Sequence, residues 1–160
     1  MKLKAFKIVI DTSSLIYLEY ANLLNFVLLK YKVFTFYAVL KEFRRKSDKK
    51  LININFLKSG SITDTGDECI IKFFSIKNNR KNFVLLTDDG KLCNFAKRNN
   101  IFYINSLRMP YFIYKDFFID YKNILKYFAK IKFYGYYSNR IINFAENELI
   151  NLIKERGHYD

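Results

Sequence analysis

The sequence predicts an α/β fold, with three α/β/α layers around a central, mainly parallel sheet. Short apolar runs that suit buried strands alternate with longer amphipathic runs that suit helices, from residue 7 to about residue 105. In addition, Asp11 follows one strand candidate directly and Asp88 and Asp89 follow another. Functional groups gather at the carboxyl ends of the strands in such sheets, so these acids are candidate site residues.

The strand candidates are short, rich in β-branched or aromatic residues and bounded by polar turns. They cover residues 7–10, 33–36, 51–55, 83–87 and 101–104. Helices are expected from about residue 15 to 19, 21 to 30, 38 to 46, 65 to 74 and 90 to 99. We expect Thr12, Ser13 or Ser14 to cap the first helix, because their hydroxyls accept hydrogen bonds from free helix N–H groups.

The chain beyond Pro110 is predicted to be helical. Apolar residues follow helical spacing up to Ile131, and again after Ser138, which suits an N-cap; Gly157 suits a helix end. The sequence therefore predicts a core, residues 1–112, and a helical extension, residues 113–160. The extension is expected as a helical pair packed on the core or on a second subunit.

Composition narrows the class of protein. The 160 residues are 51% hydrophobic, enough for one well-filled domain. No apolar run reaches the roughly 20 residues that cross a membrane, so we expect a soluble, cytoplasmic protein without a membrane partner. Cys69, Cys93 and His158 are too few and too dispersed for a disulfide framework or a zinc site.

The charge balance predicts a polyanionic partner. There are 28 Lys and Arg residues against 15 Asp and Glu residues, a net charge of +13. The acids nevertheless concentrate locally. Their clearest block comprises Asp64, Asp67, Glu68, Asp88 and Asp89. An acidic cluster in a basic chain indicates a metal-dependent site that cuts or holds nucleic acid.

The candidate carboxylates come from separate segments. They are Asp11, Glu42, the pair Asp67 and Glu68, and the pair Asp88 and Asp89. Two carboxylates about 4 Å apart repel by about 4 kcal/mol at an effective dielectric of about 20, so convergence calls for protons, water or a cation. Mg²⁺ suits a few carboxylates with open positions, where it activates water and polarises a phosphodiester.

Each acid also has a purely structural interpretation. Asp11 suits an N-cap, and Asp67 and Glu68 suit the positive end of a helix dipole. The run Asp88–Gly90 is a common turn composition, and Glu42 lies beside Lys41 as a solvated helix residue would. Their joint occurrence favours the metal site.

Four short segments resemble the PIN-domain ribonucleases in order and context. They are Asp-Thr-Ser-Ser-Leu-Ile at 11–16, Val-Leu-Lys-Glu-Phe at 39–43, Gly-Asp-Glu-Cys-Ile-Ile at 66–71, and Leu-Leu-Thr-Asp-Asp-Gly-Lys-Leu at 85–92. The resemblance covers residues 7 to about 105. It implies a PIN-like fold, a Mg²⁺ or Mn²⁺ site and cleavage of single-stranded RNA. Family members include toxins of toxin–antitoxin pairs and enzymes of RNA processing and decay, so an antitoxin protein is a candidate partner. A homodimer is a candidate as well, because the predicted C-terminal helices would expose apolar faces.

The resemblance also assigns site residues. Asp11 takes the place of the first family aspartate, Ser13 that of a small polar residue and Glu42 that of the helix glutamate. The last aspartate falls on Asp89 rather than Asp88, because it lies two residues after a Thr. The third acid stays open between Asp67 and Glu68. The implied metal ligands are Asp11, Asp67 or Glu68, and Asp89.

Basic and polar residues beside these acids are expected to contact RNA. They are Ser13, Lys41, Arg44, Arg45 and Lys91, and Lys46, Lys97 and Arg98 are expected along the same RNA groove.

Two other classes of protein compete with a nuclease. One is a catalytically weak or inactive PIN-like RNA-binding or scaffold module, because fold alone does not establish activity. The other is a phosphoaspartate receiver or phosphatase. A phosphatase needs a second aspartate two residues after Asp11, where Ser13 stands; a receiver needs a lysine after the fifth strand, where Asn105 stands.

Overall fold

The computed structural model describes residues 3, 6–47, 51, 53–117 and 119–157. Within them, five parallel strands form one sheet in the order β3-β2-β1-β4-β5. The strands are β1 (Lys7–Ile10), β2 (Lys32–Thr35), β3 (Asn55–Phe56), β4 (Phe83–Leu86) and β5 (Tyr103–Ile104). The predicted fold class is therefore confirmed.

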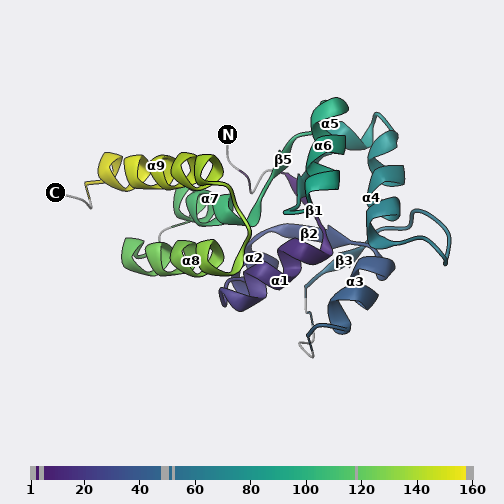
Figure 1. Cartoon of the computed structure of the whole chain (residues 1–160), viewed down its shortest axis with the longest axis horizontal. Coiled ribbons are helices and arrows are strands. Elements are labelled where there is room, and N and C mark those ends of the chain that lie inside the picture. The colour runs from purple at the N-terminus through teal and green to yellow at the C-terminus, as the bar shows by residue number, and fades with distance from the viewer. Residues whose placement is uncertain (1–2, 4–5, 48–50, 52, 118, 158–160) are drawn as a thin grey trace.

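Helices cover both faces of this sheet. The helices of the core are α1 (Thr12–Tyr20), α2 (Leu24–Lys30), α3 (Tyr37–Arg44), α4 (Gly66–Ser75), α5 (Asn79–Asn82) and α6 (Gly90–Arg98). Figure 1 shows α1 and α2 on one side of the strands, and α5 and α6 on the other. Because both faces are covered, the central strands are buried almost throughout, as parallel strands require.

The strand order creates a crevice beside β1. From β1 the chain moves outward to β2 and β3, then returns to the other side of β1 to form β4 and β5. Ile8 is thus paired with Val33 on one side and with Val84 on the other. The connections after β1 and β4 leave in opposite directions, which is where open α/β sheets bind ligands. Asp11 and Asp89 follow these two strands.

Several predicted boundaries were wrong, for local reasons. Asn22 has a left-handed backbone (φ 60°) that ends α1, so the next helix begins at Leu24 rather than near residue 21. Asn53 has the same conformation and interrupts the predicted strand 51–55, of which only Asn55 is in β3; Ile52 lies outside the described residues. Left-handed asparagines are tolerated because their short side chains hydrogen-bond locally.

The fifth strand is also shorter than predicted. Asn100 is left-handed (φ 53°), and the N–H of Ile101 donates to the carbonyl of Ala96 at 2.9 Å. This bond closes the end of α6 and delays the strand until Tyr103. The predicted N-cap of α1 was wrong as well, because Asp11 rather than a hydroxyl residue caps that helix.

The C-terminal part is helical, as expected, but contains three α-helices in the described residues rather than a pair. A 3₁₀ turn, η2 (Ser106–Arg108), leads into α7 (Met109–Asp116), α8 (Tyr121–Tyr134) and α9 (Asn139–Glu155). Pro110 lies in the first turn of α7, where a missing N–H costs no hydrogen bond. The predicted boundary after residue 112 falls inside this helix.

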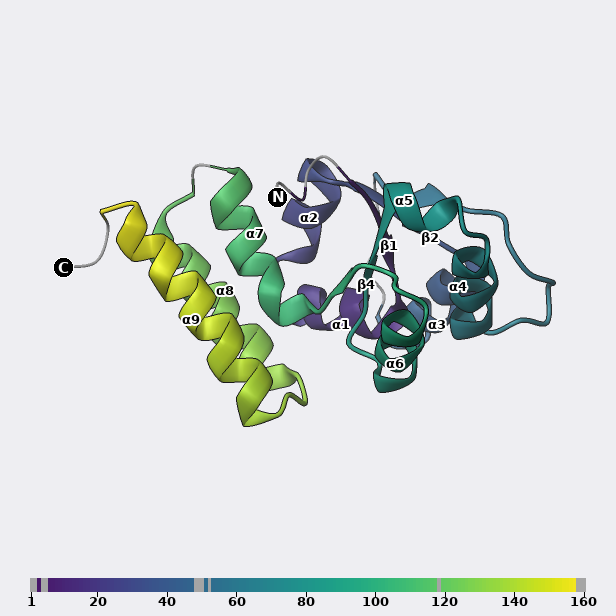
Figure 2. The same cartoon turned by 90° about the horizontal axis from the view of Figure 1, so that it is seen from above.

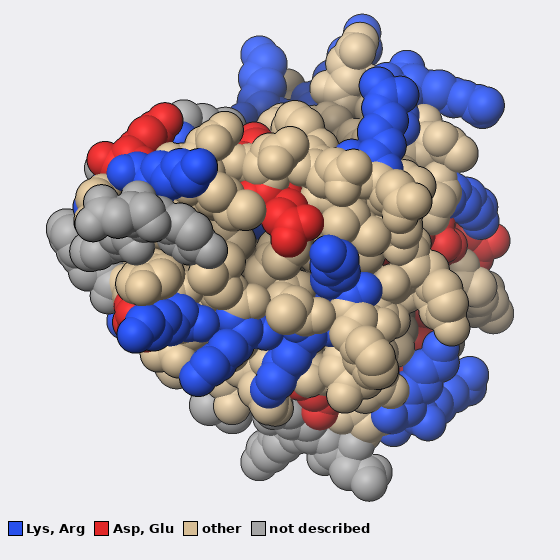
Figure 3. Space-filling view, turned by 60° about the vertical axis from the view of Figure 1, so that its left-hand side comes forward, with Lys and Arg blue, Asp and Glu red and all other residues tan. Residues whose placement is uncertain are grey.

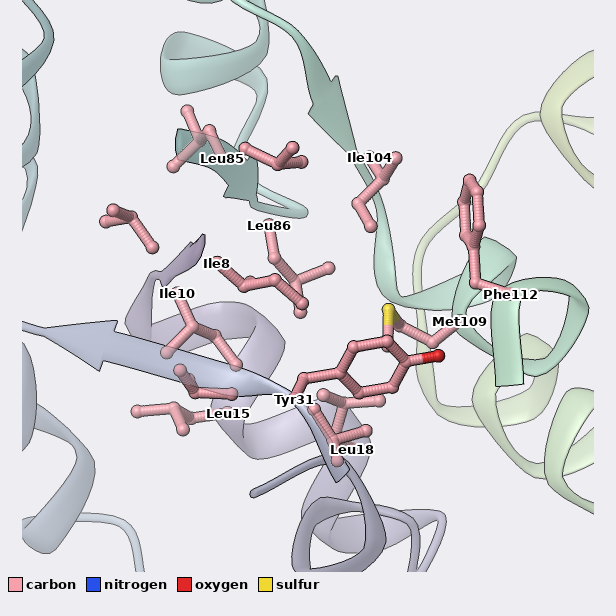
Figure 4. Packing of buried hydrophobic residues seen from close by; sticks show 14 of the residues in the cluster. Ile8, Ile10, Leu15, Leu18, Tyr31, Leu85, Leu86, Ile104, Met109 and Phe112 are labelled. Carbon is pink, nitrogen blue, oxygen red and sulfur yellow. The ribbon is translucent and has the colours of Figure 1, made fainter. Parts of the chain in front are cut away.

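The hydrophobic core runs from the sheet into these helices. Figure 2 shows α7, α8 and α9 side by side at one end of the molecule. In Figure 4, Met109 and Phe112 of α7 lie toward Tyr31, which directly precedes β2, and toward Ile104 of β5. All four belong to one cluster of buried residues. No helix within the described ranges is both long and apolar enough to cross a bilayer.

Candidate functional site: an acidic pocket at the strand ends

Four of the predicted acids line one pocket at the carboxyl edge of the sheet. The pocket has a volume of about 540 Å³. Its lining residues are Asp11, Thr12, Ser13, Ile16, Tyr17, Tyr20, Glu42, Arg45, Lys46, Asp67 and Asp89. We call it the acidic pocket. Its carboxylates come from the residues after β1 and β4, from the last turn of α3 and from the first turn of α4.

Asp11 is the most deeply buried of these acids, with 2% of its surface exposed. Its Oδ1 accepts the N–H of Ser14 at 2.8 Å, which caps α1. Its Oδ2 accepts the hydroxyls of Ser13 at 2.7 Å and of Thr87 at 2.6 Å. Burial, followed by the nearby Asp88 carboxylate, still raises the pKa of Asp11 to about 6. The three hydrogen bonds therefore offset only part of the cost of burying its charge.

Asp89 is tied to Asp11 through Thr87. The Thr87 hydroxyl donates to Asp11 and accepts the N–H of Asp89 at 3.1 Å. Asp89 also caps α6, since its Oδ1 accepts the N–H of Leu92 at 2.9 Å. Its Oδ2 accepts no hydrogen bond from the part of the chain that the structure describes. One oxygen of Asp89 is thus fixed by the fold and the other is available.

Glu42 joins three helices at the pocket wall. Its Oε1 accepts the N–H of Gly66 at 2.8 Å, and its Oε2 accepts the hydroxyl of Thr12 at 2.6 Å. A Cβ at Gly66 would lie 2.8 Å from Val39 Cγ2 and 3.1 Å from Glu42 Oε2. Glycine at position 66 therefore lets the start of α4 approach the glutamate closely.

The adjacent residues Asp67 and Glu68 have different surroundings. Glu68 forms a capping box with Thr65, whose N–H it accepts at 2.8 Å, and it does not line the pocket. Those bonds from Thr65 lower the pKa of Glu68. Asp67 does line the pocket, and burial followed by Asp89 raises its pKa, although Lys91 lies 3.9 Å away. Of this pair, only Asp67 faces the other acids.

Asp88 lies behind the acidic pocket rather than in it. Its carboxylate accepts the Ser14 hydroxyl at 2.8 Å, the N–H of Ser106 at 3.0 Å, the Ser106 hydroxyl and the Tyr137 hydroxyl at 2.7 Å. Burial outweighs these bonds and raises the pKa of Asp88. Asp88 thus links α1, η2 and the turn between α8 and α9, while Asp89 faces the acidic pocket.

The predicted RNA-contacting residues are only partly brought together. Ser13 and Arg45 line the pocket, whereas Lys41, Arg44 and Lys91 do not. Lys46, expected beside the acids, also lines the pocket, whereas sequence reasoning did not assign Thr12, Ile16, Tyr17 and Tyr20 to the site. A signal was present for four of the α1 members, because residues 13, 16, 17 and 20 share one face of the helix that Asp11 caps.

The donor chemistry of the pocket fits Mg²⁺ or Mn²⁺. All four acids offer oxygen, the ligand that hard divalent cations prefer, and Mg²⁺ keeps several of its waters. Within the described residues, Oδ2 of Asp89 accepts no hydrogen bond and the Asp67 carboxylate has one ion pair, with Lys91 at 3.9 Å. Among the described residues, no three Asp, Glu, His or Cys side chains form a ready metal-binding group. Asp67 and Asp89 are therefore the pocket carboxylates that would be most open to a cation, whereas both oxygens of Asp11 already accept hydrogen bonds.

Comparisons of the chain with protein-family models, with curated proteins and with solved structures find no match.

Proposed function

We propose that this protein is a metal-dependent endoribonuclease with a PIN-like core, which hydrolyses phosphodiester bonds of single-stranded RNA. The observation that carries the proposal is the meeting of Asp11, Glu42, Asp67 and Asp89 in one pocket. They come from four separate segments and lie at the crevice where the strand order reverses. Capping and the shared sheet edge account for Asp11 and Asp89 lying near each other, so the proposal depends on Glu42 of α3 and Asp67 of α4 joining them in the same pocket.

The residues that line the acidic pocket have different roles in the proposed reaction. A bound Mg²⁺ or Mn²⁺ would activate water and stabilise the charge that develops on the phosphate. Asp67 and Asp89 would hold the cation, Asp11 would add buried negative charge to the pocket, and Glu42 fixes the pocket wall through its bonds to Thr12 and Gly66. Arg45 and Lys46, on the rim, bind RNA phosphates. Figure 3 shows Lys and Arg side chains spread over the face it draws, with acidic groups in small separate patches.

The direct test is cleavage of a 5′-labelled single-stranded RNA by the purified full chain. We expect cleavage with Mn²⁺ or Mg²⁺, and complete loss in excess EDTA that is reversed by adding the metal back. Isothermal titration with MnCl₂ should show binding to the same preparation. Wild-type protein that neither cleaves RNA nor binds Mn²⁺ contradicts the proposal.

The pair Asp67 and Glu68 provides an internal control. We expect Asp67→Asn to lower kcat by about 100-fold or more, because it removes a charge that holds the cation. Glu68→Gln changes the charge at the adjacent residue, which caps α4 and does not line the pocket. Single-turnover rates at saturating Mn²⁺ should therefore be close to wild type for Glu68→Gln. Equal losses in both variants would place the catalytic site elsewhere.

A second candidate function is an RNA-binding or scaffold module with the same fold and no catalysis. It is favoured by the hydrogen bonds that occupy both oxygens of Asp11 and of Glu42. A module of this kind binds RNA equally well with Mn²⁺ and with EDTA, and Asp67→Asn leaves its affinity unchanged or tighter. The cleavage assay separates the two functions.

A further inference from the structure

A second, larger pocket lies next to the acidic pocket. It has a volume of about 1030 Å³ and is bounded by α6, by β5 with η2, and by the turn between α8 and α9 with the start of α9. Figure 2 shows α6 and the α8–α9 turn on the same side of the molecule. The side chains that matter here are Lys97, Phe102, Arg108, Tyr136, Arg140 and Phe144. We call this surface the basic aromatic groove.

The groove exposes aromatic rings to solvent. Tyr136 is 97% exposed, Phe144 is 54% exposed and Phe102 is 41% exposed. Core packing does not account for rings so open, and large apolar groups gathered on one surface mark interaction sites. Aromatic rings of this kind stack on unpaired nucleic-acid bases.

The same groove carries positively charged side chains, which differ in whether they form ion pairs within the protein. Lys97 and Arg140 are exposed, and neither forms an ion pair with a described residue. Arg108 differs, because it donates to both oxygens of Glu148 at 2.8 and 2.9 Å. Its guanidinium also lies 5.2 Å from the ring centre of Phe144. Arg108 therefore positions the wall, while Lys97 and Arg140 are available for phosphates.

Two side-chain pairs place the groove against the acidic pocket. Asp89 lines the acidic pocket and its neighbour Asp88 lines the groove. Tyr17 lines the acidic pocket, Tyr137 lines the groove, and their ring centres are 6.2 Å apart. The two pockets are therefore adjacent, and an RNA strand bound at the acidic pocket would continue into the groove.

We infer that the basic aromatic groove binds single-stranded RNA beside the nucleotide held in the acidic pocket, with bases on Tyr136 and Phe102 and phosphates on Lys97 and Arg140. The inference rests on the proposed function for its choice of ligand. A protein segment would also use exposed rings. RNA fits better because the groove cations are unpaired, the chain carries a net charge of +13 and the groove adjoins a phosphodiester site.

Fluorescence anisotropy of the full chain tests the inference, with a labelled, unstructured RNA of about 10 nucleotides, in EDTA so that no cleavage interferes. Tyr136→Ala should weaken binding about 5- to 50-fold, the effect of losing one stacked base. The double variant Lys97→Ala/Arg140→Ala should make the slope of log K against log salt shallower by about 1.4, because two phosphate contacts are lost.

Matched controls come from α8, outside both pockets. Phe133→Ala removes an 81% exposed ring, and Lys126→Ala/Lys130→Ala removes two exposed charges. We expect both controls to bind more nearly like wild type than their groove counterparts do. Groove variants that match their controls in affinity and salt slope overturn the inference. So does a wild-type dimer that Tyr136→Ala converts to monomer without any loss of RNA affinity.

The two proposals fail separately. If the protein binds RNA through the groove but does not cleave it with Mn²⁺, the nuclease proposal is contradicted and the groove inference stands. If Asp67 is needed for cleavage but Tyr136→Ala binds RNA as well as wild type, the groove inference is contradicted and the nuclease proposal stands.

Discussion

Asp11→Asn is expected to abolish RNA cleavage and, in the same preparation, to stabilise the folded protein. Activity falls about 1,000-fold, because the variant loses charge at a proposed metal pocket. Stability moves the other way. Raising the pKa of Asp11 from 3.8 to about 6 corresponds to a cost of up to about 3 kcal/mol at neutral pH. Asparagine keeps the acceptor for the Ser14 N–H, so we expect a gain of about 1 to 2 kcal/mol after repacking.

The same carboxylate gives the wild-type protein a characteristic pH dependence. A raised folded-state pKa means that the folded protein binds more protons than the unfolded chain between the two values. The contribution of Asp11 to stability is therefore complete below pH 3.8 and is lost as the pH rises through about 6. Urea unfolding from pH 4 to 7.5, in EDTA, should show stability falling up to somewhat above pH 6 and then levelling, with a shallower fall in Asp11→Asn. A variant that is less stable than wild type at pH 7.5 contradicts the expected cost of the buried charge.

Asp88→Ala is expected to destabilise the fold by about 2 to 4 kcal/mol. Its carboxylate accepts four hydrogen bonds, from Ser14, from the N–H and hydroxyl of Ser106, and from Tyr137. Alanine leaves these donors without their acceptor at the junction of α1, η2 and the α8–α9 turn. The raised pKa of Asp88 shows that its charge is costly, which keeps the loss below the sum of four charged bonds.

Asp88→Asn is the matched control for this loss. Asparagine removes the charge but keeps one acceptor oxygen, and the serine hydroxyls can turn to accept from its amide. We expect it to cost less than about 1 kcal/mol in urea unfolding. Hydrogen exchange should locate the effect of alanine in α9 and the turn before it, while β1 and β4 stay protected. Equal stability of the two variants would show that these hydrogen bonds do not hold the helices to the core.

Much of the fold was predictable because its elements are locally encoded. The run Lys7–Ile10 and its successor at residue 83 are apolar, β-branched or leucine-rich, and each ends in acids, so their type and approximate extent followed from the sequence. Left-handed Asn22, Asn53 and Asn100 set boundaries that no apolar pattern reveals. An asparagine in a polar stretch suits a turn or a helix equally well until its backbone conformation is known.

The site was predictable at its strand ends and less so at its helices. Asp11 and Asp89 follow buried strands, whose carboxyl ends must share an edge of a parallel sheet. The choice between Asp67 and Glu68 depends on which of them forms the capping box with Thr65. The sequence does not decide this, because the two acids are adjacent. The basic aromatic groove unites segments more than 40 residues apart in the sequence, such as Lys97 and Arg140. Only the packing of the C-terminal helices brings them together.

Three of the four acids of the pocket lie at the beginnings of helices: Asp11 before α1, Asp89 before α6 and Asp67 in the first turn of α4. The free N–H groups at these ends carry partial positive charge, which stabilises carboxylates without any ion. The backbone thus serves as a resident counter-charge. In the proposed enzyme, assembly of the domain and loading of a cation would therefore be separate events, and the supply of divalent metal would control the activity while the fold persists.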